Sequence, residues 1–189
     1  MLRSVYVSTA ACAALIIGTI PAFAADRIPL DGATAEVCFT PGADCASVVA
    51  GAIVASRERV WLLGYGFSEP SILGALTAAR GRGVDVRVIL DRSNDNGSYS
   101  GAVYMAKIGV PVLIDRSVRI AHNKLILIDR DTVVMGSLNW TKAGNTKNAE
   151  NVHIFRGARE LSERHADYFR GREAVSAPYK PKPSGPTSR

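Results

Sequence analysis

Apolar and polar positions along the first half of the chain predict strands and helices in turn. Short apolar runs typical of buried strands are separated by amphipathic stretches, in which apolar side chains recur every three or four residues. The expected strands are 35–39, 60–67, 84–90 and 110–114, and the expected helices are 46–58, 69–82 and 99–108. This alternation is typical of a sheet with parallel neighbouring strands and helices on its faces.

The second half of the chain has a different rhythm. Three predicted strands, 122–129, 132–139 and 150–156, follow one another without room for long helices between them. A last amphipathic segment predicts a helix over 158–170. Together the two halves indicate an α/β fold with a mixed, mostly parallel central sheet flanked by helices.

The start of the chain is typical of an export signal. Arg3 precedes a short apolar stretch, and Ala22-Phe23-Ala24 has the small-x-small pattern of a cleavage site. An uncleaved membrane anchor is the alternative, but the apolar stretch is short and ends at Pro21. We therefore expect residues 1–24 to be a signal peptide and the protein to be exported, either to the periplasm or outside the cell.

The rest of the chain is expected to form one domain and a tail. Residues 25–175 carry the pattern of strands and helices, and their number suits a single domain. In residues 176–189, prolines alternate with lysines and an arginine. This composition predicts a basic, Pro-rich, disordered tail.

Composition narrows the class of protein. The 189 residues are 47% hydrophobic and 21% charged, with a formal net charge of +6. An intrinsically disordered chain would be more polar and more highly charged. The sequence also contains no apolar run of the roughly 18 residues that a membrane-spanning helix requires. We therefore expect a folded domain whose positive charge favours polyanionic partners.

Two cysteines stay in the chain after the expected cleavage. Cys12 is removed with the signal, which leaves Cys38 and Cys45 on either side of Pro41-Gly42. Export to an oxidising compartment and an even number of cysteines favour a disulfide that closes a small loop. A metal site is the alternative, but no second Cys or His pair stands nearby at ligand spacing.

The residues that indicate chemistry begin with His122 and Lys124 on the predicted strand 122–129. Side chains two positions apart on a strand share a face, so we expect this imidazole and this ammonium to lie together. The imidazole can attack a phosphodiester or carry a proton, while the ammonium neutralises non-bridging oxygens. Asp129 is an odd number of positions from His122, so we expect it to face the other side and to be structural.

Three further residues complete the set. Ser137 and Asn139 share a face of the predicted strand 132–139, and both can donate hydrogen bonds to phosphate oxygens. Glu150 begins the next strand and is expected to bind one imidazole nitrogen of His122, which leaves the other nitrogen free to attack. A single histidine on a strand is usually an ordinary polar residue, but this combination favours catalysis.

The spacing of these residues resembles the signature of a known protein family. A histidine is followed by a lysine two positions on, an aspartate five positions later and, after six more residues, Gly-Ser-x-Asn; here these are His122, Lys124, Asp129, Gly136, Ser137 and Asn139. The pattern resembles the signature of the phospholipase D superfamily, and its surroundings over 37–170 resemble the small Nuc-type endonucleases of bacteria, with one motif per chain. The resemblance implies a phospholipase D-like fold in which Asp129 and Gly136 are structural positions.

The resemblance also implies a two-step reaction. His122 attacks phosphorus and forms a phosphohistidine, while Lys124, Ser137 and Asn139 hold the phosphoryl oxygens and Glu150 orients His122. No metal and no other cofactor is implied, because lysine and amide groups neutralise the charge that a cation neutralises in many phosphodiesterases.

The implied reaction needs two histidines, whereas the motif occurs once. His153 has the opposite strand parity to Glu150, His165 falls in the last predicted helix, and neither has a lysine two residues on. The resemblance implies that two chains pair across a twofold axis, the commonest oligomer symmetry. In this homodimer each chain supplies one His122 and one Lys124 to a composite active site.

These features favour a sequence-nonspecific endonuclease that hydrolyses DNA, with RNA as a second substrate. The alternative is a phospholipase D-type enzyme that hydrolyses phosphatidylcholine or related phospholipids by the same chemistry, with phospholipid as its partner. A non-catalytic binding protein on the same fold is a further alternative, which the complete motif disfavours.

Basic and aromatic residues surround the motif. The basic residues in nearby loops and strand ends are Arg92, Arg116, Arg119, Lys142 and Lys147. They would form a rim that attracts a polyanion, although ordinary surface charge also explains them. Trp140 could stack on a base, but we favour its burial against the sheet.

Overall fold

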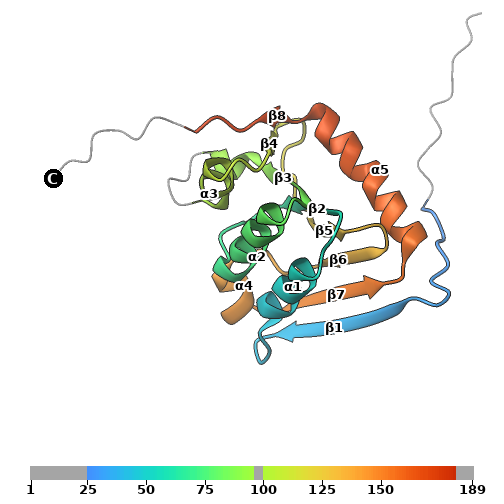
Figure 1. The fold of residues 1–189 in the computed structure, drawn as a ribbon. Helices are drawn as coiled ribbons and strands as arrows, with labels where there is room; N and C mark the ends of the chain where they lie inside the picture. Colours follow the sequence, from blue (N-terminus) through green and yellow to red (C-terminus); the bar gives the residue numbers. More distant parts are fainter. Residues whose placement is uncertain (1–24, 96–99, 182–189) are drawn as a thin grey trace, which may run out of the picture.

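The computed structural model describes residues 25–95 and 100–181, so the expected signal peptide and the end of the chain lie outside the described residues. The strands are β1 (Thr34–Thr40), β2 (Arg59–Gly64), β3 (Asp85–Asp91), β4 (Val112–Asp115), β5 (Lys124–Ile128), β6 (Thr132–Gly136), β7 (Glu150–Arg156) and β8 (Ala177–Pro178). The helices are α1 (Cys45–Val54), α2 (Pro70–Gly81), α3 (Gly101–Lys107), α4 (Lys142–Thr146) and α5 (Arg159–Val175), with a 3-10 turn at Arg92–Asp95. All the strands belong to one sheet in the order β1-β7-β6-β5-β2-β3-β4-β8 (Figure 1).

The sheet is mixed, and its parallel part is small. β2, β3 and β4 run parallel to one another, whereas the other neighbouring strands in this sheet are antiparallel. The α/β class with flanking helices is therefore confirmed, but the expectation of mostly parallel strands is wrong. Parallel neighbours need a long crossover, which α2 and α3 provide, while β5, β6 and β7 follow one another through shorter connections.

Helices cover both faces of the sheet and form two cores. α1 and α2 cover one face, whereas α5 crosses the other (Figure 1). Because side chains on a strand alternate, Leu62 of β2 faces the first core and Trp61 faces the second. In the second core the rings of Trp61 and Phe169 stack with centroids 5.0 Å apart. The central strands β2 and β5 are thus buried on both faces and form a rigid base for the site at their ends.

Three predicted strands are shorter than expected at one edge of the sheet. β2 ends at Gly64 rather than residue 67, β5 begins at Lys124 rather than residue 122, and β6 ends at Gly136 rather than residue 139. The backbone leaves the ladder here because its polar groups find other partners. Ser68 N–H, for example, donates to the carbonyl of Trp140 at 2.7 Å. These early strand ends shape the candidate site.

The sheet also continues into the expected tail. Ala177 and Pro178 pair with Ile114 and Leu113 of β4, and Tyr179 N–H donates to the carbonyl of Val112 at 2.9 Å. β4 would otherwise be an edge strand, and a proline is tolerated beside an edge. The prediction of a disordered tail from residue 176 is therefore wrong for residues 177–179, which belong to the ordered domain. Residues 182–189 lie outside the described part of the chain.

The expected disulfide is present. Cys38 in β1 and Cys45 at the start of α1 are bonded, with their Cα atoms 5.6 Å apart. The bond ties the edge strand to the helix that follows it. Among the helices in the described part of the chain, none has both the length and the apolar character needed to cross a bilayer.

Candidate active site

The site residues predicted from the sequence gather at the end of the sheet where β2, β5 and β6 are shorter than expected. Lys124 begins β5, His122 lies two positions before it, and Glu150 begins β7. Ser137 and Asn139 follow the end of β6. Antiparallel pairing brings these strand ends to one edge, because β5 and β7 begin where their neighbour β6 ends.

Tyr65, directly after β2, joins the histidine and the lysine. Its ring meets the His122 ring edge-on, with centroids 4.7 Å apart. Lys124 Nζ lies 5.4 Å from the centroid of the same ring and donates to the carbonyl oxygen of His122 at 3.2 Å. The imidazole and the ammonium therefore lie together as expected, although His122 precedes the strand.

Lys124 has an unusual environment for an ammonium. The residue is only 9% exposed, whereas His122 is exposed. Burial lowers the pKa of Lys124, and the negative charge of Glu150 partly opposes that shift. A poorly hydrated ammonium beside an accessible imidazole is suited to stabilise the charge that develops on a phosphoryl group.

Ser137 and Asn139 are both oriented as hydrogen-bond donors. Ser137 Oγ accepts the N–H of Asn151 at 3.0 Å, which leaves the hydroxyl proton to donate elsewhere. Asn139 Oδ1 accepts the N–H of Gly66 at 3.4 Å, which leaves its amide nitrogen to donate. Such donors suit phosphate oxygens, which accept hydrogen bonds and never donate them when ionised.

Gly136 is required by a close approach between β6 and β7. A Cβ at this position would collide with the carbonyl oxygen of Asn151. That same oxygen accepts the N–H of Ser137 at 3.1 Å and of Leu138 at 3.4 Å. The glycine thus lets the chain turn out of the sheet and carry Ser137 into the site.

Glu150 begins β7 as predicted, but its side chain makes a local hydrogen bond. Its Oε1 accepts a hydrogen bond from Asn148 Nδ2 at 3.0 Å, and the described side chains include no hydrogen bond between Glu150 and His122. Its charge nevertheless acts on Lys124. The hydrogen bond to Asn148 is a local one, because Asn148 lies two positions before Glu150, just ahead of the strand, and the contact with His122 stays a prediction.

Asp129 lies at the far end of β5, away from the site. It has a positive φ of 51°. Its carboxylate accepts the backbone N–H groups of Arg57, Glu58 and Arg59 at 2.7 to 3.2 Å. These bonds hold the turn that leads into β2, so Asp129 acts on the frame of the domain.

The other two histidines lie outside the motif. His153 stacks on Phe155, which packs against the second core. Lys124 shares a strand face with Ile126 of the first core, so His153 and Lys124 lie on opposite faces of the sheet. His165 lies on α5, where its Nδ1 is 2.8 Å from the carbonyl oxygen of Leu161. His122 is thus the histidine of the motif itself, whereas His165 lines a groove that Lys124 also lines.

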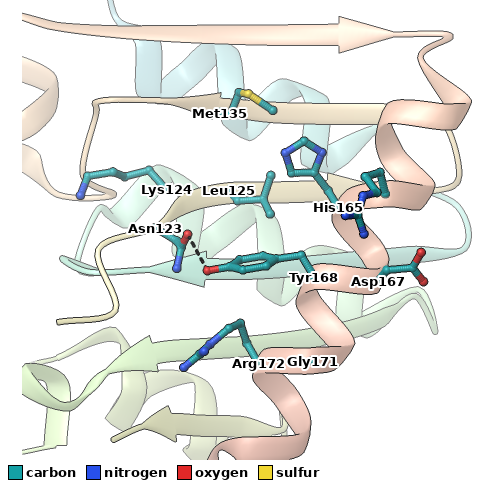
Figure 2. A pocket seen from close by; sticks show the side chains of 10 residues that line it. Asn123, Lys124, Leu125, Met135, His165, Asp167, Tyr168, Gly171 and Arg172 are labelled. Atoms are coloured by element: carbon teal, nitrogen blue, oxygen red, sulfur yellow. Dashed lines mark hydrogen bonds between the residues drawn. The ribbon is translucent and has the colours of Figure 1, made fainter. Parts of the chain in front are cut away.

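α5 and the sheet enclose a groove on the opposite face from α1 and α2. Its volume is about 830 Å³, and its lining includes Leu125, Met135, His165 and Tyr168 (Figure 2). Tyr168 donates to Asn123 Oδ1 at 3.4 Å (Figure 2). The hydrogen bond ties α5 to the residue between His122 and Lys124.

Trp140 is fully buried, and its indole N–H donates to the carbonyl of Leu63 at 3.1 Å. This burial confirms the favoured interpretation and leaves no ring face for a base. Of the expected basic rim, Lys142 begins α4 and Lys147 follows it. Arg92, Arg116 and Arg119 line one cleft, which Tyr65 also lines.

Sequence reasoning missed two residues that shape the site. Tyr65 bridges His122 and Lys124, and Asp91 at the end of β3 anchors the segment before His122. Asp91 accepts the N–H of Ser93 at 2.8 Å and of Ala121 at 2.7 Å. Burial opposes ionisation, but these hydrogen bonds hold the pKa of Asp91 below its usual value. The signal in the sequence that could have identified Asp91 is its position directly after a buried apolar strand.

A second buried carboxylate anchors the same segment. Asp115 is 1% exposed and pairs with Arg172 of α5, whose Nε donates at 2.8 Å. It also accepts the N–H and the hydroxyl of Ser117 at 3.0 and 2.8 Å. Burial alone would raise the pKa of Asp115, but the Arg172 and Ser117 hydrogen bonds hold it below its usual value. β4, α5 and the start of the segment that leads to His122 are therefore locked together.

We expect Asp115→Asn to lower the free energy of unfolding at pH 7 by about 3 kcal/mol, because it removes one partner of a buried ion pair. A carboxylate with a lowered folded-state pKa contributes stability above about pH 4 and loses it as the pH falls through that pKa. The difference between the two proteins should therefore shrink toward about pH 3. Urea unfolding at both pH values measures it, with the exposed Asp167→Asn as control. An equally large difference at both pH values would contradict the electrostatic explanation.

Among the described residues, no three His, Cys, Asp or Glu side chains gather as a metal site would require. What the site offers is an exposed imidazole, a buried ammonium and two neutral donors. Together these groups can attack a phosphodiester and stabilise its extra negative charge.

Sequence comparison finds relatives over most of the chain. A sequence model of the family described as "Cardiolipin synthase, PLD-like domain" matches residues 49–172. A protein named phospholipase D from Rickettsia felis is 42% identical over 139 residues, which are 74% of this chain and 69% of that protein.

Structural comparison finds the same architecture in small bacterial proteins. Nuc from Salmonella typhimurium, described as a phospholipase D family member, is 32% identical with a TM-score of 0.75, and the match covers 79% of this chain and 99% of Nuc. NucT from Helicobacter pylori has a TM-score of 0.72 over 78% of this chain and 99% of its own. At 21% identity the NucT match shows the fold alone.

Proposed function

The chain belongs to the phospholipase D-like family of phosphodiesterases, and we propose that within it the protein is a metal-independent, sequence-nonspecific endonuclease. DNA is the proposed substrate, with RNA as a second one. The observation that carries the proposal is the exposed His122 beside the buried Lys124 at the end of the sheet. The structural match to Nuc, which covers 99% of the Nuc chain, supports it. It is supported by the resemblance of the motif region to Nuc-type endonucleases.

The proposed reaction has two steps. A neutral imidazole nitrogen of His122 attacks phosphorus, the bond from phosphorus to the leaving oxygen breaks, and that oxygen takes a proton from a second imidazolium. The second imidazole then removes a proton from water, which attacks phosphorus and releases His122. Lys124, Ser137 and Asn139 donate to the phosphoryl oxygens throughout, which favours the crowded and highly charged transition states.

The second histidine is proposed to be His122 of the partner subunit. His153 faces the second core and His165 lines the groove beside α5, and neither belongs to the motif, so the motif of one protomer supplies one histidine. A twofold axis beside the open edge would bring two His122 and two Lys124 to one phosphate. We therefore propose a homodimer with one composite active site.

The name of the Rickettsia felis relative, phospholipase D, supports a second candidate function. In a lipid phosphodiesterase the same residues would break the bond between phosphorus and the headgroup oxygen of a phospholipid such as phosphatidylcholine. The two functions differ in the leaving group and in what surrounds the phosphate, so the choice between them requires a direct substrate test.

We expect the protein to cleave plasmid DNA in excess EDTA and to leave phosphatidylcholine vesicles intact. The chelator removes divalent cations, and the proposed catalytic groups need none. Gel electrophoresis follows the DNA, and enzymatic detection of choline follows the lipid. Choline release with intact DNA would favour the lipid candidate, whereas loss of DNA cleavage in EDTA would contradict metal independence.

A further inference from the structure

A cleft of about 500 Å³ opens directly beside the proposed active site. Its lining consists of Tyr65, Asp91, Arg92, Ser93, Asp95, Arg116, Arg119 and Ile120. Tyr65 is the wall that the cleft shares with the site, because the same ring contacts His122 and Lys124. Tyr65 therefore lies between the proposed active site and the cleft.

The charges in the cleft leave two arginines available for a ligand. Arg116 pairs with Asp95 at 2.7 Å. Asp91 is 2% exposed, and its oxygens accept backbone N–H groups. Arg92 and Arg119 are exposed and have no ion-pair partner among the described residues, although Arg92 lies near enough to lower the pKa of Asp91. The cleft thus presents two guanidinium groups to solvent.

Hydrogen bonds hold the walls of the cleft in place. The buried Asn94 donates through Nδ2 to the carbonyl of Tyr65 at 2.6 Å and to that of Asp91 at 3.2 Å. Asp91 in turn fixes Ala121, which follows Arg119 and Ile120. The segments that carry the two arginines are therefore tied to Tyr65, so the cleft has a set position relative to the attacking imidazole.

We propose that this cleft binds the phosphates of a nucleic acid strand that neighbour the phosphate under attack, with Arg92 and Arg119 as their ligands. The inference rests on the proposed nuclease function and adds a preference for polymeric substrate. A guanidinium can donate two parallel hydrogen bonds to a phosphate. A nucleic acid strand offers phosphates beyond the reacting one, whereas phosphatidylcholine has a single phosphate.

The proposed dimer extends this inference. A twofold axis through the composite site places one copy of the cleft on each side of the reacting phosphate. A strand that crosses the site would then be held on both sides by arginines. Such contacts read no base, which fits cleavage without sequence specificity.

The test is a double variant, Arg92→Gln with Arg119→Gln, assayed on oligothymidylates of 2, 4, 8 and 16 nucleotides. We expect wild-type kcat/KM to rise with length, and the variant to lose about tenfold per arginine on the longest strand. The dinucleotide, which has no neighbouring phosphodiester, should be cleaved equally by both proteins. The salt dependence of binding to the 16-mer should weaken by about 0.7 per arginine in the log–log slope.

The matched control is Arg130→Gln with Arg159→Gln, which removes the same charge from exposed residues away from the cleft. It should follow the wild type, and Arg92→Lys with Arg119→Lys should keep most of the salt dependence. If kcat/KM rises with strand length equally in the double Gln variant of Arg92 and Arg119 and in the wild type, the role of the cleft alone is overturned. Absence of cleavage of every strand by the wild-type protein would instead overturn the proposed nuclease function, and the cleft with it.

Discussion

His122→Ala is expected to reduce phosphodiester cleavage by about 10⁴-fold or more, because it removes the nucleophile and, in the composite site, the proton carrier as well. His122 is exposed beside Tyr65, so its loss should leave the fold intact. Initial rates on plasmid DNA in EDTA measure the effect, and thermal unfolding shows whether the variant is folded. The wild-type protein should also form a covalent adduct with a labelled oligonucleotide that the variant does not form.

The matched control for this prediction is His153→Ala. His153 stacks on Phe155 on the other face of the sheet, so the variant should keep the activity of the wild type. A His122→Ala protein that is folded and fully active would refute the proposed mechanism. An equal loss in both variants would mean that the histidines matter for something other than attack on phosphorus.

The same variant tests the composite site. Heterodimers of wild-type and His122→Ala chains, separated by two different affinity tags, should be as inactive as the variant, because each site needs one histidine from each chain. Heterodimers with His153→Ala should remain active. If the His122→Ala heterodimer keeps half of the wild-type activity, each protomer carries its own complete site.

Lys124→Gln is expected to lower kcat by about 10² to 10³-fold with a smaller change in KM, because the ammonium stabilises charge that is largest in the transition state. The loss should be large because Lys124 is nearly buried, and burial already lowers its pKa by weakening its hydration. Glutamine keeps a hydrogen-bond donor of similar length, so the change isolates the charge. Steady-state kinetics on a defined oligonucleotide measures both constants.

Lys142→Gln at the exposed start of α4 provides the control with the same change of charge. It should alter activity little beyond a weaker salt dependence. A loss shared equally by the two variants would attribute the effect to general attraction of a polyanion. A Lys124→Gln protein with raised KM and unchanged kcat would mean that the ammonium only binds substrate.

The α/β class, the disulfide between Cys38 and Cys45, and the meeting of His122 with Lys124 could all be predicted from the sequence. Each depends on residues that are near one another in the chain or on the periodicity of a single element. The predicted contact between Glu150 and His122 depended instead on the relative position of two strands. The structure pairs Glu150 with Asn148, two positions away.

The predicted boundaries of several strands were wrong for a related reason. An apolar run predicts a strand as long as its side chains suit burial, but the strand ends where its backbone finds other partners. The region after Gly136 shows this, since Ser137 and Leu138 N–H groups bind the carbonyl of Asn151. The mixed sheet is confirmed, but the expectation of mostly parallel strands was wrong because strand direction follows from the connections, which periodicity does not record.

The sequence by itself determined which groups the site has available, because the motif places an imidazole, an ammonium and hydrogen-bond donors at short, regular spacings. Only the tertiary structure decided their surroundings. Tyr65 meets His122, Asp91 binds Ala121, and the arginines line one cleft only because strands distant in the chain end at the same edge of the sheet. Burial and hydrogen bonding between distant segments are properties of the packed sheet, so no local pattern in the sequence contains them.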